Sequence, residues 1–265
     1  MPALRSEWTK TRSLRTTGLL GIVLVAGTML LTVLWCSGVS TEGGSGLPCL
    51  PRGGDEDVVR NSLGGIYLGQ IAVVAFATLA ITSEYATRTI SSTFMGVPRR
   101  HDVLLAKAGV ISGLVLVAGL AVSTAAFLVG QPLLHGNGFT CANGYPIVSL
   151  ADTIALRAVT GTALYLLAVA LLSLGVGALL RHTAGAITTT LGLLYIPMVI
   201  AALLPASVAH RIEQIGPMTA GLAVQQTVER TDNVPLAPWA GLAIAFTWAI
   251  GALVAGAIRV RYSDA

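Results

Sequence analysis

The sequence predicts an all-α integral membrane protein with six transmembrane helices, on the evidence of its composition, its apolar runs and the placement of its charges. Hydrophobic residues make up 54% of the 265-residue chain and charged residues only 11%, and the mean hydropathy is +0.77. Such a composition is typical of proteins that span a bilayer. Six runs supply the roughly 20 apolar residues that a spanning helix needs, and none of the six contains Asp, Glu, Lys or Arg. They cover residues 17–36, 62–82, 108–130, 158–180, 183–204 and 236–258.

The distribution of basic residues predicts that both termini are cytoplasmic. With the N-terminus inside, the cytoplasmic segments hold 11 of the 16 Lys and Arg residues, and the opposite side holds the other 5. This asymmetry is the usual one for membrane proteins, so the net charge of +4 reflects orientation rather than a nucleic-acid partner. The excess of Arg over Lys and the abundance of Ala and Gly indicate a bacterial source. We therefore expect a multi-pass protein of the bacterial plasma membrane.

Residues 1–16 are predicted to form an amphipathic helix at the membrane surface. Leu4 and Trp8 share one helix face, and Arg12 and Arg15 suit contact with anionic lipid headgroups. Trp8, Arg12 and Arg15 are thus candidate interface anchors, and a disordered basic tail is the alternative. The apolar run that follows is longer than the core of a signal peptide and no A-x-A site follows it, so we interpret it as a retained first span.

The segment 82–107, between the second and third spans, is polar and basic and has apolar runs on both sides. Its part from Glu84 to Met95 is compatible with a short amphipathic helix, which Pro98 would end. So polar a segment must project into water, and we interpret it as a transmission element that contacts a soluble partner. The alternative is that Arg99 and Arg100 only set the orientation or bind anionic lipids.

The predicted external loops contain two of the cysteines, Cys49 in residues 37–61 and Cys141 in residues 131–150. Because both would lie on the more oxidising side of the membrane, a disulfide between them is one hypothesis and free thiols are the other. Three consecutive carboxylates, Asp55 to Asp57, also lie in the first loop. Consecutive side chains do not converge on one ion without other ligands, so we favour a solvated loop over a metal site.

Uncharged polar residues and glycines mark the positions where the spans are expected to contact one another. Tyr67, Gln70 and Thr78 in the second span either bond to neighbouring helices or line a substrate path. Gly65 and Gly69 have the four-residue spacing that lets two helices approach closely, and packing within the chain is favoured over a dimer seam.

The stretch 205–235, between the last two spans, is predicted to contain two short helical pieces. Pro205, Gly216 and Pro217 divide it. The pieces are too short to span the bilayer, so they either re-enter its outer leaflet or form a surface cap. Trp239, at the start of the last span, is a further candidate interface anchor.

The chain lacks the sequence signals of the common catalytic and cofactor sites. Neither lysine, Lys10 or Lys107, follows a glycine, so there is no phosphate-binding loop, and the four histidines have no metal-ligand spacing. We therefore expect no catalytic residue, no metal and no enzymatic activity in this chain. Ion-coupled carriers usually place charged groups inside their spans, and these spans contain none. An uphill transporter with such spans would need an energy source in a partner.

Four stretches match, in order and spacing, the pattern of one transporter family. They are RSEWTK at Arg5 to Lys10, the segment from Glu84 to Lys107, LGVGALLR at Leu174 to Arg181, and PWAGL at Pro238 to Leu242. Together they resemble the membrane subunit of type 2 ABC exporters, permeases of six spans that pair with a separate ATPase. The resemblance extends from end to end of the chain.

The resemblance implies an elbow helix at residues 1–16, a transmembrane domain at residues 17–265 and a coupling helix in the first cytoplasmic loop. One departure is Arg88, where this family leads us to expect glycine, and its bulk and charge are expected to alter how the loop seats on the ATPase. The coupling residues would be Glu84, Tyr85, Arg88, Thr89, Pro98, Arg99 and Arg100.

The resemblance also implies the partners and the transport reaction. Two copies of a cytoplasmic ATPase would bind ATP and Mg, and a second copy of this permease or a similar one would complete the path. The exported solute would be hydrophobic or amphipathic, such as a drug, an antibiotic peptide or a lipid. The alternative function is a membrane anchor or sensor that recruits a soluble partner and transports nothing.

Overall fold

A computed structural model describes residues 15–40, 56–86, 100–145, 147–227 and 236–262 of the chain. These residues fold into helices joined by turns and irregular connections, with no strand among them. Six of the described helices are long and apolar enough to cross a membrane, so the prediction of a six-helix, multi-pass membrane protein is confirmed. These helices are α2 (Arg15–Gly38), α4 (Ile66–Ala86), α6 (Arg100–Gly136), α7 (Thr153–Leu180), α8 (Thr183–Leu203) and α11 (Pro238–Tyr262).

Several helix boundaries differ from those predicted, among them those of the second and third spans, and α7 begins five residues before the predicted start of the fourth span. The second span begins at Ile66 rather than Ser62, because the short helix α3 (Val58–Ser62) and a turn precede it. Asp57 caps α3 by accepting a hydrogen bond from the backbone amide of Arg60 at 3.0 Å. The third span, predicted for residues 108–130, extends over 37 residues as α6 and continues through Pro132. Membrane helices tolerate proline where neighbouring groups satisfy the freed backbone carbonyl.

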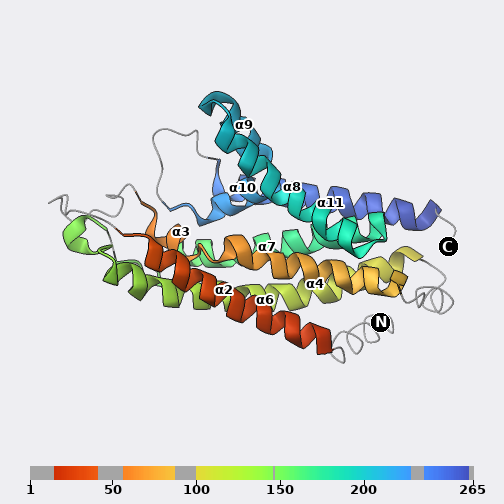
Figure 1. Cartoon of the computed structure of the whole chain (residues 1–265), viewed down its shortest axis with the longest axis horizontal. Coiled ribbons are helices and arrows are strands. Elements are labelled where there is room, and N and C mark those ends of the chain that lie inside the picture. The colour runs from red at the N-terminus through yellow and green to blue at the C-terminus, as the bar shows by residue number, and fades with distance from the viewer. Residues whose placement is uncertain (1–14, 41–55, 87–99, 146, 228–235, 263–265) are drawn as a thin grey trace.

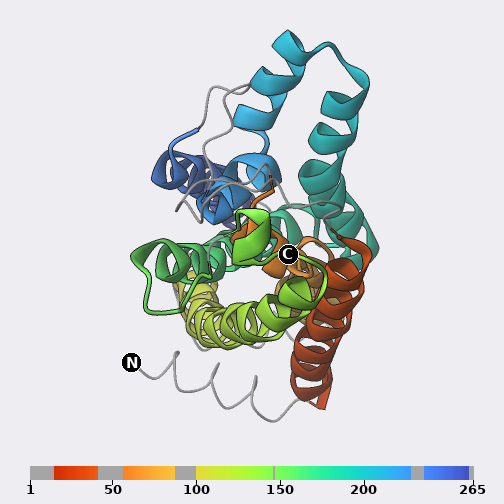
Figure 2. The same ribbon diagram turned by 90° about the vertical axis from the view of Figure 1, so that its left-hand side faces the viewer.

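The helix α7 lies at the centre of the bundle. Within the spanning windows, 72% of the residues of α7 are buried, against 22% for both α2 and α8. Helices α4, α6 and α11 pack directly on α7, and α2 lies across α4 and α6 (Figure 2). Figure 1 shows the bundle from the side: the end at which α2 begins and α11 ends is called the terminal end here, and the opposite end is called the distal end.

The segment that follows α8 forms two helical pieces, as predicted. Helix α9 (Ala206–Ile215) folds back along α8 and has no buried residue, and the α8–α9 hairpin stands out from the rest of the bundle (Figures 1 and 2). The chain then turns at Gly216 into α10 (Pro217–Gly221) and the 3₁₀ helix η2 (Leu222–Gln225), which are largely buried against α7, α8 and α11. Whether these pieces re-enter the bilayer stays a prediction.

Close helix contacts occur where glycines replace side chains. A Cβ atom on Gly65 would lie 2.2 Å from Oγ1 of Thr32 on α2, and one on Gly69 would lie 2.2 Å from Oγ1 of Thr28. The predicted role of this glycine pair in packing within the chain is thereby confirmed. A close approach also joins α7 and α11, where a Cβ on Gly175 would lie 2.5 Å from backbone atoms of Ala252 and Leu253. In contrast, Gly113 on α6 is exposed, and an added Cβ there would meet no atom within 4 Å.

Candidate functional site at the terminal end of the bundle

The structure describes only part of the predicted coupling segment. Tyr85 lies in the last turn of α4. Glu84 belongs to the same turn and Arg100 begins α6, but their side chains lie outside the description. Residues 87–99 lie outside the described part, and with them Arg88, Thr89, Pro98 and Arg99. The coupling helix itself therefore stays a prediction.

Tyr85 packs against Arg181, the residue that ends α7. The guanidinium carbon of Arg181 lies 5.2 Å from the centre of the Tyr85 ring, within the range of a cation–π contact. Arg181 adopts a left-handed backbone conformation, with φ of 57°, and its backbone amide donates to the carbonyl of Gly177 at 2.9 Å. This conformation closes the C-terminus of α7 without a glycine.

A hydrogen bond between two threonines joins the same two regions of the chain. The hydroxyl of Thr183, the first residue of α8, donates to that of Thr82 at 2.8 Å. Thr82 is 1% exposed, and its own hydroxyl donates to the carbonyl of Thr78 at 2.9 Å. Between Arg181 and Thr183, the side chain of His182 caps α8 by accepting from the amide of Gly185 at 3.1 Å. The end of α4 is therefore attached at two points to the short α7–α8 turn.

Arg181 also links this turn to the last helix. Its Nη2 atom lies 3.4 Å from the carbonyl oxygen of Arg259 near the end of α11, a long hydrogen bond. The side chain of Arg181 thus joins the end of α7 to α4 and α11, and the bond between Thr183 and Thr82 joins α8 to α4 at the same end. Lys107, in the part of α6 nearest the terminal end, is 6% exposed and is therefore buried in the bundle. We call the set Thr82, Tyr85, Arg181 and Thr183 the terminal junction.

A second polar cluster lies inside the bundle around Gln70. The hydroxyl of Tyr165, which is fully buried, donates to Oε1 of Gln70. The amide nitrogen of Gln70 lies 3.1 Å from the hydroxyl of Tyr195 and 3.0 Å from the sulfur of Met218. These contacts join α4, α7, α8 and α10. Of the two roles predicted for Gln70, bonding to neighbouring helices is the one that the structure bears out.

A third polar cluster, at the distal end, joins the residues that follow η2 to the start of α3. The hydroxyl of Thr227, just after η2, donates to Oδ1 of Asp57 at 2.7 Å. Arg60, in α3, donates from Nη2 to the hydroxyl of Tyr67 at 2.9 Å. Burial lowers the pKa of Arg60, but its interactions with Tyr67, Asp57 and Glu213 outweigh burial and raise the pKa above its ordinary value. The sequence assigned Asp57 to a solvated loop. In the structure its side chain instead caps the N-terminus of α3 and binds Thr227.

The other predicted site residues are placed as follows. Trp8 and Arg12 lie outside the described residues, and Arg15 begins α2 without a described side chain. Trp239, the second residue of α11, has an exposed fraction of 58%, which suits an interface anchor.

Of the three cysteines, Cys36 is a free and buried thiol, whereas Cys141 begins the 3₁₀ helix η1 (Cys141–Asn143) and is disulfide-bonded. Cys49 lies outside the described residues, so its pairing with Cys141 stays a prediction.

Sequence reasoning missed Tyr165, Tyr195, Arg181 and Thr183 as members of these polar clusters. Tyrosines in the middle of apolar spans were an available signal, since a buried tyrosine hydroxyl needs a partner. No comparable signal pointed to Arg181, which the sequence placed only as a charge at the end of a span. Its partner Tyr85 lies on a helix almost a hundred residues earlier in the chain.

Comparisons with known proteins leave the family open. No protein-family model matches the chain, and no curated protein matches it. The resemblance to ABC permeases is carried by the sequence motifs alone.

Proposed function

We propose that this chain is the transmembrane permease subunit of an ATP-driven ABC exporter of the bacterial plasma membrane. A separate cytoplasmic ATPase, present in two copies, would supply the energy, and a second permease would complete the path. The solute would be hydrophobic or amphipathic. Both termini and the segment 87–99 would face the cytoplasm.

The observation that carries the proposal is the terminal junction. The candidate coupling segment continues directly from α4 and returns as α6, so a force on it acts on the ends of both helices. The contacts of Tyr85 with Arg181, and of Thr82 with Thr183, connect α4 to the α7–α8 turn. Arg181 continues the connection to α11. A displacement of the coupling segment can therefore reach four spans through direct contacts, as rigid-body switching requires.

In the proposed cycle, closure of the ATP-bound ATPase dimer pushes the coupling segment toward the bundle. The terminal end of α4 moves with it, and the junction carries α7, α8 and α11 along. The spans then open a path to the outside, and no coupling ion is invoked because the six apolar runs predicted from the sequence contain no charged residue. Glu84, Arg88, Thr89, Arg99 and Arg100 would contact the ATPase, and Tyr85 would transmit the movement.

The first test is co-purification of the tagged chain from its native membranes in a mild detergent. We expect a soluble protein with a phosphate-binding loop to accompany it in about equal amount, identified by mass spectrometry. Replacing Arg99 and Arg100 together with alanine is expected to weaken its recovery, whereas the matched replacement of Arg259 and Arg261 is expected to leave it unchanged. Recovery of an intact sample without any such ATPase contradicts the proposal and favours the anchor or sensor.

The second test concerns transmission through Tyr85. We expect Tyr85→Leu to leave the complex assembled and hydrolysing ATP but to abolish the ATP-dependent movement at the distal end. Spin labels on cysteines introduced at the exposed positions Ile147 and Val208 measure that movement as a change in distance. The matched control is Tyr262→Leu, because Tyr262 is exposed and also contacts an arginine, its neighbour Arg261, at 5.8 Å, but within the described ranges no hydrogen bond or ring contact joins it to a second helix. An equal ATP-dependent change in wild type and Tyr85→Leu would refute the transmission role.

A further inference from the structure

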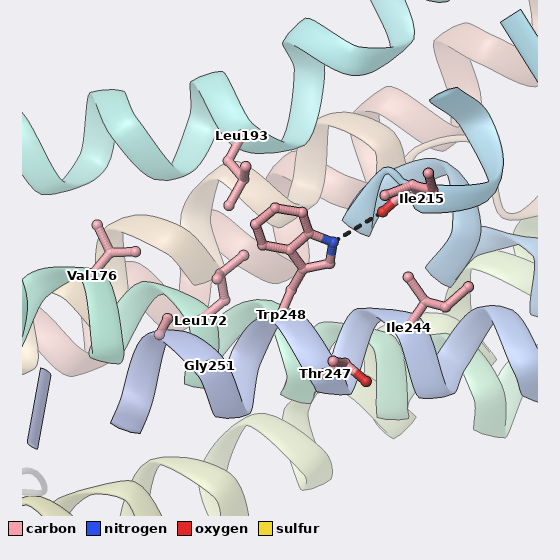
Figure 3. Close-up of a pocket in the computed structure, with 9 residues that line it drawn as sticks. Leu172, Val176, Leu193, Ile215, Ile244, Thr247, Trp248 and Gly251 are labelled. Atoms are coloured by element: carbon pink, nitrogen blue, oxygen red, sulfur yellow. Dashed lines mark hydrogen bonds between the residues drawn. The ribbon is translucent and has the colours of Figure 1, made fainter. Parts of the chain in front are cut away.

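A cavity of about 580 Å³ lies between α7, α8 and α11, halfway along the spans (Figure 3). Leu172 and Val176 of α7 form its floor, and Leu193 of α8 and Trp248 of α11 form its walls. Ile215, the last residue of α9, closes the side toward the distal end. Thr247, Trp248 and Gly251 are exposed, so the cavity is open to the surface of the bundle.

The lining presents hydrocarbon and aromatic surface, and its polar side-chain groups already have partners. The indole nitrogen of Trp248 donates to the carbonyl of Ile215 at 2.9 Å, which Figure 3 shows, and this bond holds the end of α9 over the cavity. The hydroxyl of Thr247 donates to the carbonyl of Ala243 within its own helix at 2.8 Å. No charged residue lines the cavity. A polar or charged ligand would thus lose its hydration without gaining a partner.

The surroundings of the cavity indicate what fills it. Its exposed wall, α11, is a candidate membrane span whose window runs from Pro238 to Arg259, and Thr247 to Gly251 lie near the middle of that window. The surface around the mouth continues as exposed Ile196 on α8 and as Ile250 and Val254 on α11, which are apolar side chains that face lipid in a spanning helix. The cavity is therefore continuous with the lipid-facing surface at the depth of the acyl chains.

We propose that this cavity is a binding site for one acyl chain of a bilayer lipid. From Ile244 to Ala252 it extends about 12 Å along α11, at 1.5 Å per residue, which accommodates part of one chain. Transfer from the bilayer gains no hydrophobic energy, because lipid tails are equally apolar. Retention comes instead from dispersion contacts, since a chain in the cavity touches three spans and an indole ring at once. The proposal does not depend on the permease role.

Gly251 allows the cavity to be filled without disturbing the fold. A Cβ atom at this position would meet no other atom within 4 Å, so a larger side chain there extends into open space. The matched control is Gly113, which is equally open but lies on the exposed face of α6, away from the cavity. Gly251→Leu and Gly113→Leu therefore add the same group to a membrane-facing helix, and only the first occupies the proposed site.

The test measures the phospholipid that remains on the full chain, with any bound partner, after extensive washing in detergent. We expect about one phospholipid per wild-type chain, with Gly251→Leu lowering the occupancy roughly tenfold and Gly113→Leu leaving it unchanged. Leu193→Trp fills the cavity from α8 and serves as a second variant should Gly251→Leu misfold. Equal retention in wild type and both filled variants overturns the proposal. A second outcome also overturns the proposal: Gly251→Leu retains as much phospholipid as the wild type but no longer self-associates. That result would show that a second copy of the chain, rather than a lipid, occupies the cavity.

A second readout locates the bound chain. It uses a variant that keeps Trp248 and has phenylalanine in place of Trp8, Trp35 and Trp239. Lipids with acyl chains brominated at mid-chain should quench the fluorescence of Trp248, and this quenching should persist after the detergent washes. Quenching of Trp248 that disappears on washing in this single-tryptophan variant shows ordinary lipid contact and overturns the proposal.

Discussion

Replacing Gly175 with leucine is expected to prevent stable assembly of the bundle, with a loss of about 3 kcal/mol or more in the free energy of unfolding. A Cβ at this position would lie 2.5 Å from the backbone carbon of Ala252 and the backbone nitrogen of Leu253. Backbone atoms cannot rotate away as a flexible side chain can, so α7 and α11 would have to separate. Gly256 faces the same contact from α11, where an added Cβ would lie 2.8 Å from the carbonyl oxygen of Gly175.

The control for Gly175→Leu is Gly113→Leu. Leucine favours helix more than glycine does by roughly 0.5–1 kcal/mol, and Gly113 has open space around it. We therefore expect this control to be neutral or slightly stabilising. Thermal unfolding in detergent, followed by size-exclusion chromatography of the remaining folded protein, measures both variants. A Gly175→Leu protein as stable as the control would show that α7 and α11 do not cross at this residue.

Gln70→Leu is expected to lower the free energy of unfolding by about 1–2 kcal/mol. Leucine has a similar volume but can neither accept from the Tyr165 hydroxyl nor donate to that of Tyr195. Both hydroxyls would then lose a partner inside the bundle, where water is scarce. Because α4, α7, α8 and α10 all meet at Gln70, the loss is expected to loosen the attachment of α10.

A double-mutant cycle with Tyr165→Phe tests the origin of this loss. If the hydrogen bond between Gln70 and Tyr165 is responsible, the double variant should be more stable than the sum of the two single losses predicts. Thr190→Val is a suitable control, because Thr190 is also buried but bonds only to the carbonyl of Ala186 in its own helix, at 2.9 Å. Additive losses in the cycle would mean that the two side chains do not interact.

The membrane spans were predictable because the relevant signal is local. A run of apolar residues long enough to cross the bilayer is recognisable without knowledge of its neighbours, since the bilayer itself supplies the solvent that such a helix requires. The break at Gly216 and Pro217 was predictable for a similar reason, because proline and glycine act on their own backbone. The start of α4 was not predictable from the sequence, because contacts outside α3 help to hold this short helix in place. Asp57 accepts a hydrogen bond from Thr227, and Arg60 donates one to Tyr67.

The candidate site could be predicted only in part. Tyr85 was expected to transmit movement from its place in a polar segment between two spans. That its contact would be Arg181 depends on the rotation of α4 and α7 about their axes, which apolar spans do not determine. The same holds for Gln70, whose partners Tyr165 and Tyr195 are 95 and 125 residues away along the chain.

The sequence by itself determined that this chain has six helices long and apolar enough to cross a membrane, and that the chain breaks between two helices at Gly216 and Pro217. Each of these properties follows from the solvation or the backbone chemistry of a short stretch. The tertiary structure alone decided that α7 is central, that the terminal junction joins four spans and that an apolar cavity lies beside Trp248. These features depend on which faces of distant helices meet, and helices of nearly uniform apolarity carry little local information about that choice.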